Sequence, residues 1–133
     1  MASLSAIEMI QRNAELVIES TYQQFNVSLA YDEEAVDWLD ANIDFLRGKN
    51  YPPNDVAMFI NMLGAFYGEC IRHQFTSEWT EYQGTYMLRL ENNQLISPFS
   101  KVLKQFESGD SVAVFFVSIP RLLKQFPNQK DSS

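Results

Sequence analysis

The sequence predicts an α+β domain with three N-terminal helices, a three-stranded antiparallel meander and two C-terminal helices around a buried central helix. Three observations support this prediction. Residues 56–75 carry apolar side chains at helical spacing on nearly every side, as in a buried helix. Over residues 78–96 the apolar period changes to two, which is typical of strands. Helix start signals stand at Ser5, Asp32 and Ser97.

The first two helices have recognisable ends. Ser5 and Glu8 have the spacing of a capping box, so the first helix is expected from Ser5 to about Phe25. Asp32 is expected to cap a second helix, which Gly48 ends. Both helices carry their apolar residues on one face and are therefore amphipathic.

The central helix contains two glycines one turn apart, Gly64 and Gly68. Each costs about 1 kcal/mol relative to alanine in a helix, so a compensating contact is expected. The sequence predicts that another backbone packs closely against this notch. Glu69 follows directly, inside the apolar segment.

The meander is expected to turn at Gly84 and at the asparagine pair 92–93. Ser97 and Pro98 then have the types expected at the cap and first position of a fourth helix, which stops at Gly109.

The last apolar segment, residues 112–119, is ambiguous. Its β-branched and aromatic residues suit a buried strand, whereas Asp110 as a cap and the short connection favour a helix, with Pro120 as a kink or break. We expect a helix. Residues 1–126 are expected to form one domain, and residues 127–133 a disordered tail.

The composition restricts the class of partner. The chain has 133 residues and a net charge of −7, and residues 1–50 hold nine acids against three Lys or Arg. Nucleic acids and anionic membranes repel carboxylates, so neither is an expected partner. A single cysteine excludes an internal disulfide, and no secretory signal or membrane-spanning run is apparent. We therefore expect a cytoplasmic protein.

Four carboxylates form one stripe along the second helix: Glu33, Asp37, Asp40 and Asp44. Their spacing places them on one helical face, which is expected to face water. An ordinary solvated helix face gives the same pattern. Such a row also complements a basic protein surface and steers its approach.

Glu69, His73 and Trp79 are the second group of candidate site residues. A desolvated carboxylate with a histidine one turn away is a candidate general base in a pocket. Alternatively, Glu69 accepts hydrogen bonds from backbone amides, or from Arg72 or Trp79, and fixes the helix to the sheet. His73 is the only histidine, no metal or cofactor motif is present, and Cys70 is expected to be a buried structural thiol.

Several segments resemble small, largely uncharacterised bacterial α+β domains, some of which accompany toxins as immunity proteins. These segments are LGAFYGE at residues 63–69, Trp79 at the head of a hairpin, PFSKV at residues 98–102 and GDSV at residues 109–112. The resemblance implies a helix ending in Gly-x-x-x-Gly-Glu before a meander. It carries over no catalytic residue.

The leading functional hypothesis is a non-enzymatic binding protein that neutralises a basic toxin through the acidic stripe. The alternative is a small-ligand-binding or enzymatic domain with a pocket at Glu69 and His73, bordered by Trp79. No cofactor is expected under the leading hypothesis. The sequence leaves the partner's identity and the oligomeric state open.

Overall fold

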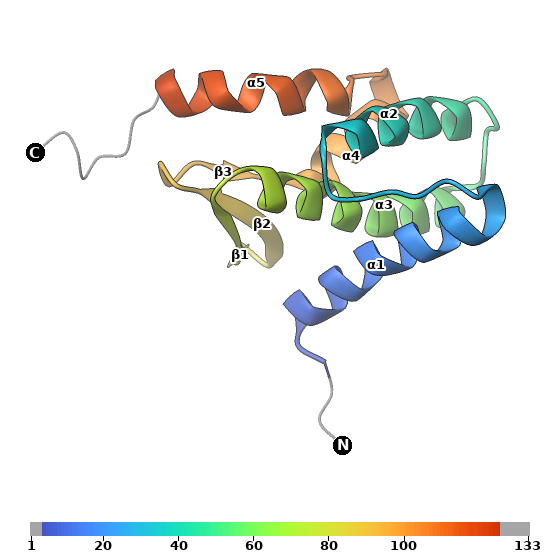
Figure 1. The fold of residues 1–133 in the computed structure, drawn as a ribbon, viewed down its shortest axis with the longest axis horizontal. Helices are drawn as coiled ribbons and strands as arrows, with labels where there is room; N and C mark the ends of the chain where they lie inside the picture. The colour runs from blue at the N-terminus through green and yellow to red at the C-terminus, as the bar shows by residue number, and fades with distance from the viewer. Residues whose placement is uncertain (1–3, 126–133) are drawn as a thin grey trace, which may run out of the picture.

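The computed structural model describes residues 4–125 and has the predicted α+β architecture. The segment expected to be disordered, residues 127–133, lies outside the described residues. Figure 1 shows the elements in chain order. They are α1 (Ala6–Phe25), α2 (Glu33–Arg47), α3 (Pro53–Gln74), β1 (Ser77–Tyr82), β2 (Thr85–Leu90), β3 (Leu95–Ile96), α4 (Pro98–Ser108) and α5 (Val112–Gln125).

Helix α3 runs through the middle of the molecule, and the other elements surround it (Figure 1). Helices α1 and α4 pack mainly on α3, whereas α5 packs mainly on α2. The sheet lies beside the C-terminal end of α3. Buried side chains from all five helices and all three strands belong to one hydrophobic core.

The predicted helix starts are confirmed. The Ser5 hydroxyl accepts a hydrogen bond from the Glu8 amide, and the Glu8 carboxylate accepts one from the Ser5 amide, both at 3.1 Å. The Asp32 carboxylate accepts the Ala35 amide at 2.8 Å, and the Ser97 hydroxyl caps α4 in the same way. These bonds satisfy amides that have no partner inside their helix, so they favour helix formation from these residues.

Burial of α3 is confirmed only for its second half. All nine residues from Leu63 to Ile71 are buried, including Glu69. In contrast, every residue from 53 to 62 is half-buried or exposed, and Met58 is 55% exposed. The apolar first half of α3 therefore remains partly in contact with water.

The notch at the two glycines is filled, as predicted, although by two different kinds of group. A methyl group on Gly64 would lie 3.0 Å from the backbone Cα of Phe99 and 2.4 Å from its ring. On Gly68 it would lie 2.3 Å from the indole ring of Trp79. The expected backbone contact thus occurs at Gly64, where α4 crosses, whereas at Gly68 a side chain from β1 fills the space.

The sheet is the predicted meander, with strand order β1-β2-β3 and antiparallel pairing throughout. Gln83 and Gly84 connect β1 to β2 with φ values of 52° and 81°, as a tight two-residue hairpin turn requires. Asn93 has a φ of 69° in the second turn, which lies where the asparagine pair predicts it.

The ambiguous segment forms a helix, α5, that continues through Pro120 to Gln125 without a break. Its cap differs from the expectation. The Ser111 hydroxyl, not the Asp110 carboxylate, accepts the Val114 amide at 3.1 Å. The α-helical state wins over the strand propensity of these residues because tertiary packing and polar contacts fix the start of α5.

We expect Gly68→Ala to lower the free energy of unfolding by about 1–3 kcal/mol, because the added methyl group overlaps the Trp79 indole and the packed sheet restricts its movement. Gly48→Ala is the matched control. There the nearest atom would be 3.5 Å away, and we expect a change of less than about 0.5 kcal/mol. Urea unfolding measures both. A Gly68→Ala protein with the same urea midpoint as the wild type would contradict the predicted overlap with the Trp79 indole.

Candidate functional site

The structure divides the acidic stripe of α2 into two parts. Glu33, Asp37 and Asp44 are exposed, whereas Asp40 is half-buried. The expectation that Asp40 projects into water is therefore wrong. Its side chain faces the point where α4 ends and α5 begins, so it has a structural role there.

The Asp40 carboxylate binds the first turn of α5. Its Oδ2 atom accepts hydrogen bonds from the Ser111 hydroxyl and, at 3.0 Å, from the Ala113 amide. A carboxylate is favoured at this place because the amides at a helix N-terminus carry partial positive charge. Asp40 therefore helps to cap a helix that is remote in sequence.

Gln105 completes this contact, and sequence reasoning missed it. Its side chain is fully buried. The amide nitrogen donates to the Asp40 carbonyl at 2.9 Å and to the Asp44 carboxylate at 3.1 Å, while the amide oxygen accepts from the Val112 amide at 2.9 Å. The available signal was its position three residues after Val102, on the apolar face of α4.

A further hydrogen bond comes from α3. The Tyr67 hydroxyl donates to the Val112 carbonyl oxygen at 2.7 Å, and burial raises the pKa of this phenol. The first turn of α5 is thus held by Asp40 from α2, Gln105 from α4 and Tyr67 from α3. We call this set of contacts the α5 junction.

The second candidate group, around Glu69, is brought together by the structure. Glu69 is 3% exposed, and both of its oxygens are engaged. Arg72 donates Nε to Oε2 at 2.8 Å and Nη2 to Oε1 at 3.1 Å. The Trp79 indole nitrogen donates to Oε2 at 2.9 Å. This arrangement fixes α3 to β1, as in the structural alternative considered for this glutamate.

His73 lies at the edge of this group. Its Nε2 is 3.8 Å from Oε1 of Glu69, and its side chain is 43% exposed. Its ring packs against that of Tyr31 with centroids 4.6 Å apart. Burial, followed by the charge of Glu69, raises the pKa of Tyr31 to about 12, so this phenol is protonated at neutral pH.

The geometry favours a structural role for Glu69 over a ligand pocket. The Trp79 ring lies directly on Gly68 and occupies the space beside the carboxylate. Four of the best-formed surface cavities on the described part of the chain are lined by other residues. A substrate reaching Glu69 would have to displace Arg72 or Trp79, and the pocket hypothesis receives no support from these contacts.

Cys70 is buried, as expected, and burial raises the pKa of its thiol. It is therefore protonated and a poor nucleophile. Among residues 4–125, no group of three or more His, Cys, Asp or Glu side chains is arranged to hold a metal ion. Within the same residues, no helix is long and apolar enough to cross a membrane.

Comparison of the chain with models of protein families, with curated proteins and with solved structures gave no match. The function is therefore inferred from the surface and contacts described above.

The α5 junction predicts unequal roles for two neighbouring carboxylates. Asp40→Asn should lower the free energy of unfolding by about 1–3 kcal/mol, because the amide carries no charge to cap α5 and offers one acceptor oxygen instead of two. Asp37→Asn, on the exposed face of the same helix, should change it by less than about 0.5 kcal/mol. Chemical denaturation of the two variants measures this difference, and equal stabilities would exclude the capping role.

We expect Glu69→Gln to destabilise the protein by about 2 kcal/mol or more, since Arg72 loses its ion pair and a buried amide faces its guanidinium. Trp79→Phe in both backgrounds gives a double-mutant cycle, in which a coupling above about 0.5 kcal/mol supports a direct bond. The control is His73→Gln, expected to cost less than about 1 kcal/mol. A coupling energy near zero would show that Trp79 and Glu69 contribute independently to stability.

Proposed function

We propose that the chain is a non-enzymatic protein-binding domain whose partner has a basic surface. The observation that supports this proposal is the group of carboxylates at the start of α2, namely Glu33, Glu34 and Asp37. All three are exposed, and none forms an ion pair within residues 4–125. Unpaired carboxylates on one rigid element attract a cationic surface and direct its approach.

The helix that carries these exposed carboxylates is held in place by hydrogen bonds to neighbouring elements. Asp40 and Asp44 lie on the same helix and accept hydrogen bonds at the α5 junction, so polar contacts hold α2 in addition to its core residues. A binding surface on a fixed helix loses little conformational entropy when the partner arrives. We thus assign Glu33 and Asp37 to partner binding, and Asp40 to maintaining the helix.

The partner class follows from charge. Toxins that act on nucleic acids or nucleotides need cationic clefts, and an acidic helix is complementary to such a cleft. We therefore propose an immunity protein that covers the active site of a bacterial toxin, in agreement with the sequence resemblance. We place it in the cytoplasm, because its cysteine is a free buried thiol that suits a reducing compartment.

The test compares charge reversal at two surfaces. Wild-type protein is used to capture the partner from the source organism, and association rates are then measured over a range of salt concentrations. Reversal of Glu33 and Asp37 to lysine should slow association at low salt by about tenfold or more and reduce its salt dependence.

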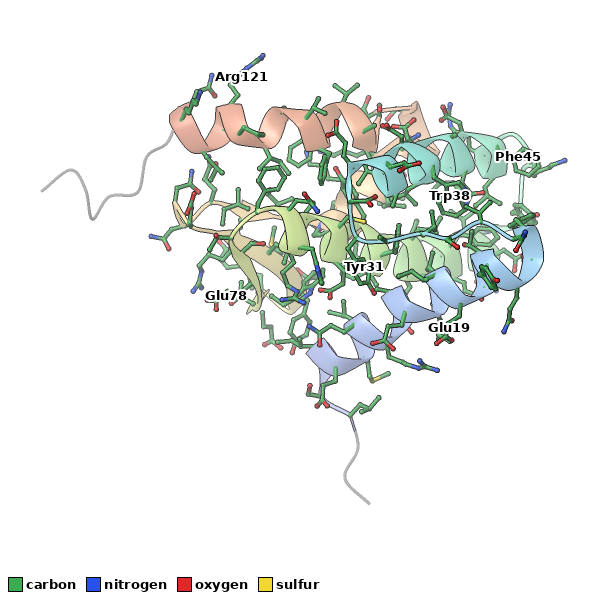
Figure 2. All side chains as sticks on the ribbon, viewed as in Figure 1. Glu19, Tyr31, Trp38, Phe45, Glu78 and Arg121 are labelled. Atoms are coloured by element: carbon green, nitrogen blue, oxygen red, sulfur yellow. The ribbon has the colours of Figure 1, made fainter. Side chains whose placement is uncertain are left out.

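The matched control reverses Glu78 and Glu81 to lysine. Both are exposed on β1, and Figure 2 shows Glu78 on the sheet, away from α2. This control should leave the association rate within about twofold of the wild type. Melting temperatures establish that each variant is folded. An unchanged rate for the α2 variant, measured with folded protein at low salt, would exclude this face as the binding surface.

A further inference from the structure

A cavity of about 440 Å³ lies between the short strand β3, the first half of α4 and helix α5. Its volume is in the range of pockets that bind small molecules. Ile96 of β3 and Phe115 of α5 contribute apolar walls. Helix α4 contributes polar groups, namely Ser100, Lys101 and Lys104. Apolar walls with a few polar groups on one side are typical of a ligand site.

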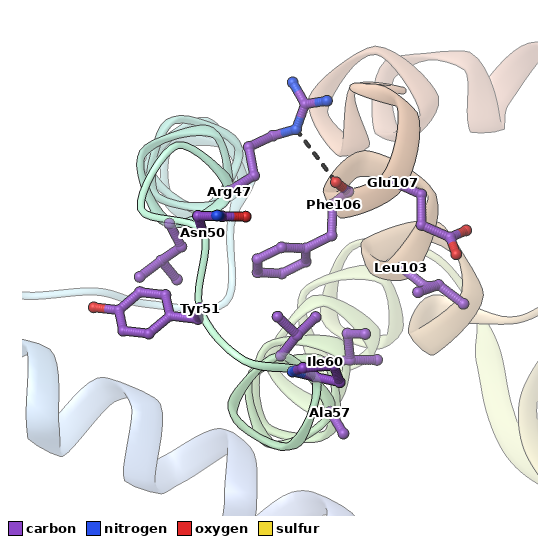
Figure 3. A pocket seen from close by; sticks show the side chains of 11 residues that line it. Arg47, Asn50, Tyr51, Ala57, Ile60, Leu103, Phe106 and Glu107 are labelled. Atoms are coloured by element: carbon purple, nitrogen blue, oxygen red, sulfur yellow. Dashed lines mark hydrogen bonds between the residues drawn. The ribbon is translucent and has the colours of Figure 1, made fainter.

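The charge of this cavity is opposite to that of the whole chain. Among the described residues that line it, Lys101 and Lys104 carry positive charge and none carries negative charge, whereas the chain has a net charge of −7. The cavity at the end of α2 differs, because Arg47 and Glu107 both line it and their charges balance (Figure 3). The cavity beside β3 therefore attracts anions selectively.

Lys101 is half-buried without a carboxylate partner. Within residues 4–125, neither Lys101 nor Lys104 forms an ion pair. The Lys101 ammonium lies over the Phe115 ring, 4.0 Å from its centroid. Burial, followed by the charge of Lys104, lowers the pKa of Lys101, and Asp110 offsets this shift only in part. An anion in the cavity would stabilise the charged form of this side chain.

We propose that this cavity binds a small soluble phosphate monoester, with Lys101 and Lys104 contacting the phosphate and the apolar walls contacting its organic part. The two lysines are three residues apart on one helix, so their side chains lie on the same face and can contact one group. The Ser100 hydroxyl lines the same cavity and can donate to a phosphate oxygen.

The number of charges selects the class of anion. A phosphate monoester carries a charge of about −1.5 to −2 at neutral pH, which matches two ammonium groups better than the single charge of a carboxylate does. Lysine is also a common phosphate ligand in proteins. A polyanion such as a nucleic acid needs an extended basic surface, which the net charge of −7 opposes. The site is separate from the carboxylates of α2, so it adds to the proposed partner binding.

The test is a titration of the full chain followed by NMR amide shifts, with inorganic phosphate, phenyl phosphate and benzoate as probes. We expect phenyl phosphate to bind with a dissociation constant of about 1 mM or lower, and to shift amides of the residues that line the cavity. Inorganic phosphate should bind more weakly because it lacks an apolar part. Benzoate should bind about tenfold more weakly than phenyl phosphate, because it has a single charge.

Charge removal tests the two lysines. Lys101→Met and Lys104→Met keep an unbranched apolar side chain and should each weaken phenyl phosphate binding by about tenfold. Lys49→Met is the matched control. Lys49 is also placed over a ring, with its Nζ 4.7 Å from the Phe45 centroid, but it is exposed and does not line the cavity. It should leave the dissociation constant within about twofold of the wild type. Melting temperatures establish that all three variants are folded.

Four results would overturn the proposal. They are no saturable binding of phenyl phosphate below about 10 mM, equal weakening by all three lysine variants, unchanged binding by Lys101→Met, and benzoate binding as tight as that of phenyl phosphate.

A phospholipid is a second source of the same chemical group. Vesicles of phosphatidylcholine with phosphatidic acid, whose headgroup is a phosphate monoester, test this source. We expect the protein to stay in solution when the vesicles are sedimented, because a net charge of −7 opposes approach to an anionic surface. Sedimentation with the vesicles would overturn the assignment to a soluble ligand.

Discussion

The position of the sheet depends on the contact between the Trp79 indole and the bare backbone of Gly68. The next residue, Glu69, accepts the indole N–H at 2.9 Å, so two consecutive residues of α3 determine where the ring lies and how it is oriented. Trp79 pairs with Leu88 on β2, and Leu88 pairs with Ile96 on β3. Paired residues lie on one face of a sheet, and all three are buried. The packing of Trp79 on α3 therefore also determines where β2 and β3 lie.

The row also leads to the second glycine. Ile96 is followed by the cap of α4, and Phe99 in the first turn of α4 lies against Gly64, one turn before Gly68. The meander therefore leaves α3 and returns to it within a short distance. The two glycines, each unfavourable for helix formation, are compensated by these close contacts. The α5 junction also depends on close contacts between distant elements, because polar groups from α2, α3 and α4 fix the first turn of α5.

Local sequence signals were sufficient for most of the fold. The caps at Ser5, Asp32 and Ser97 and the turns at Gly84 and Asn93 depend on nearby residues, and all five were correctly predicted. Contacts between distant residues were harder to predict. Asp40 has the spacing of a solvent-exposed residue, and only the approach of Ser111, 71 positions later, makes it a capping group. The exposure of Met58 was also missed, because helical periodicity identifies an apolar face without identifying what covers it.

The carboxylates of α2 divide into two groups with different roles. Glu33 and Asp37 lie in its first half and are exposed, whereas Asp40 and Asp44, further along the helix, accept hydrogen bonds at the α5 junction. The proposed binding surface therefore lies on a helix that contacts with α4 and α5 already hold in place. Carboxylates on such a helix keep their positions before the partner arrives, so less conformational entropy is lost on binding.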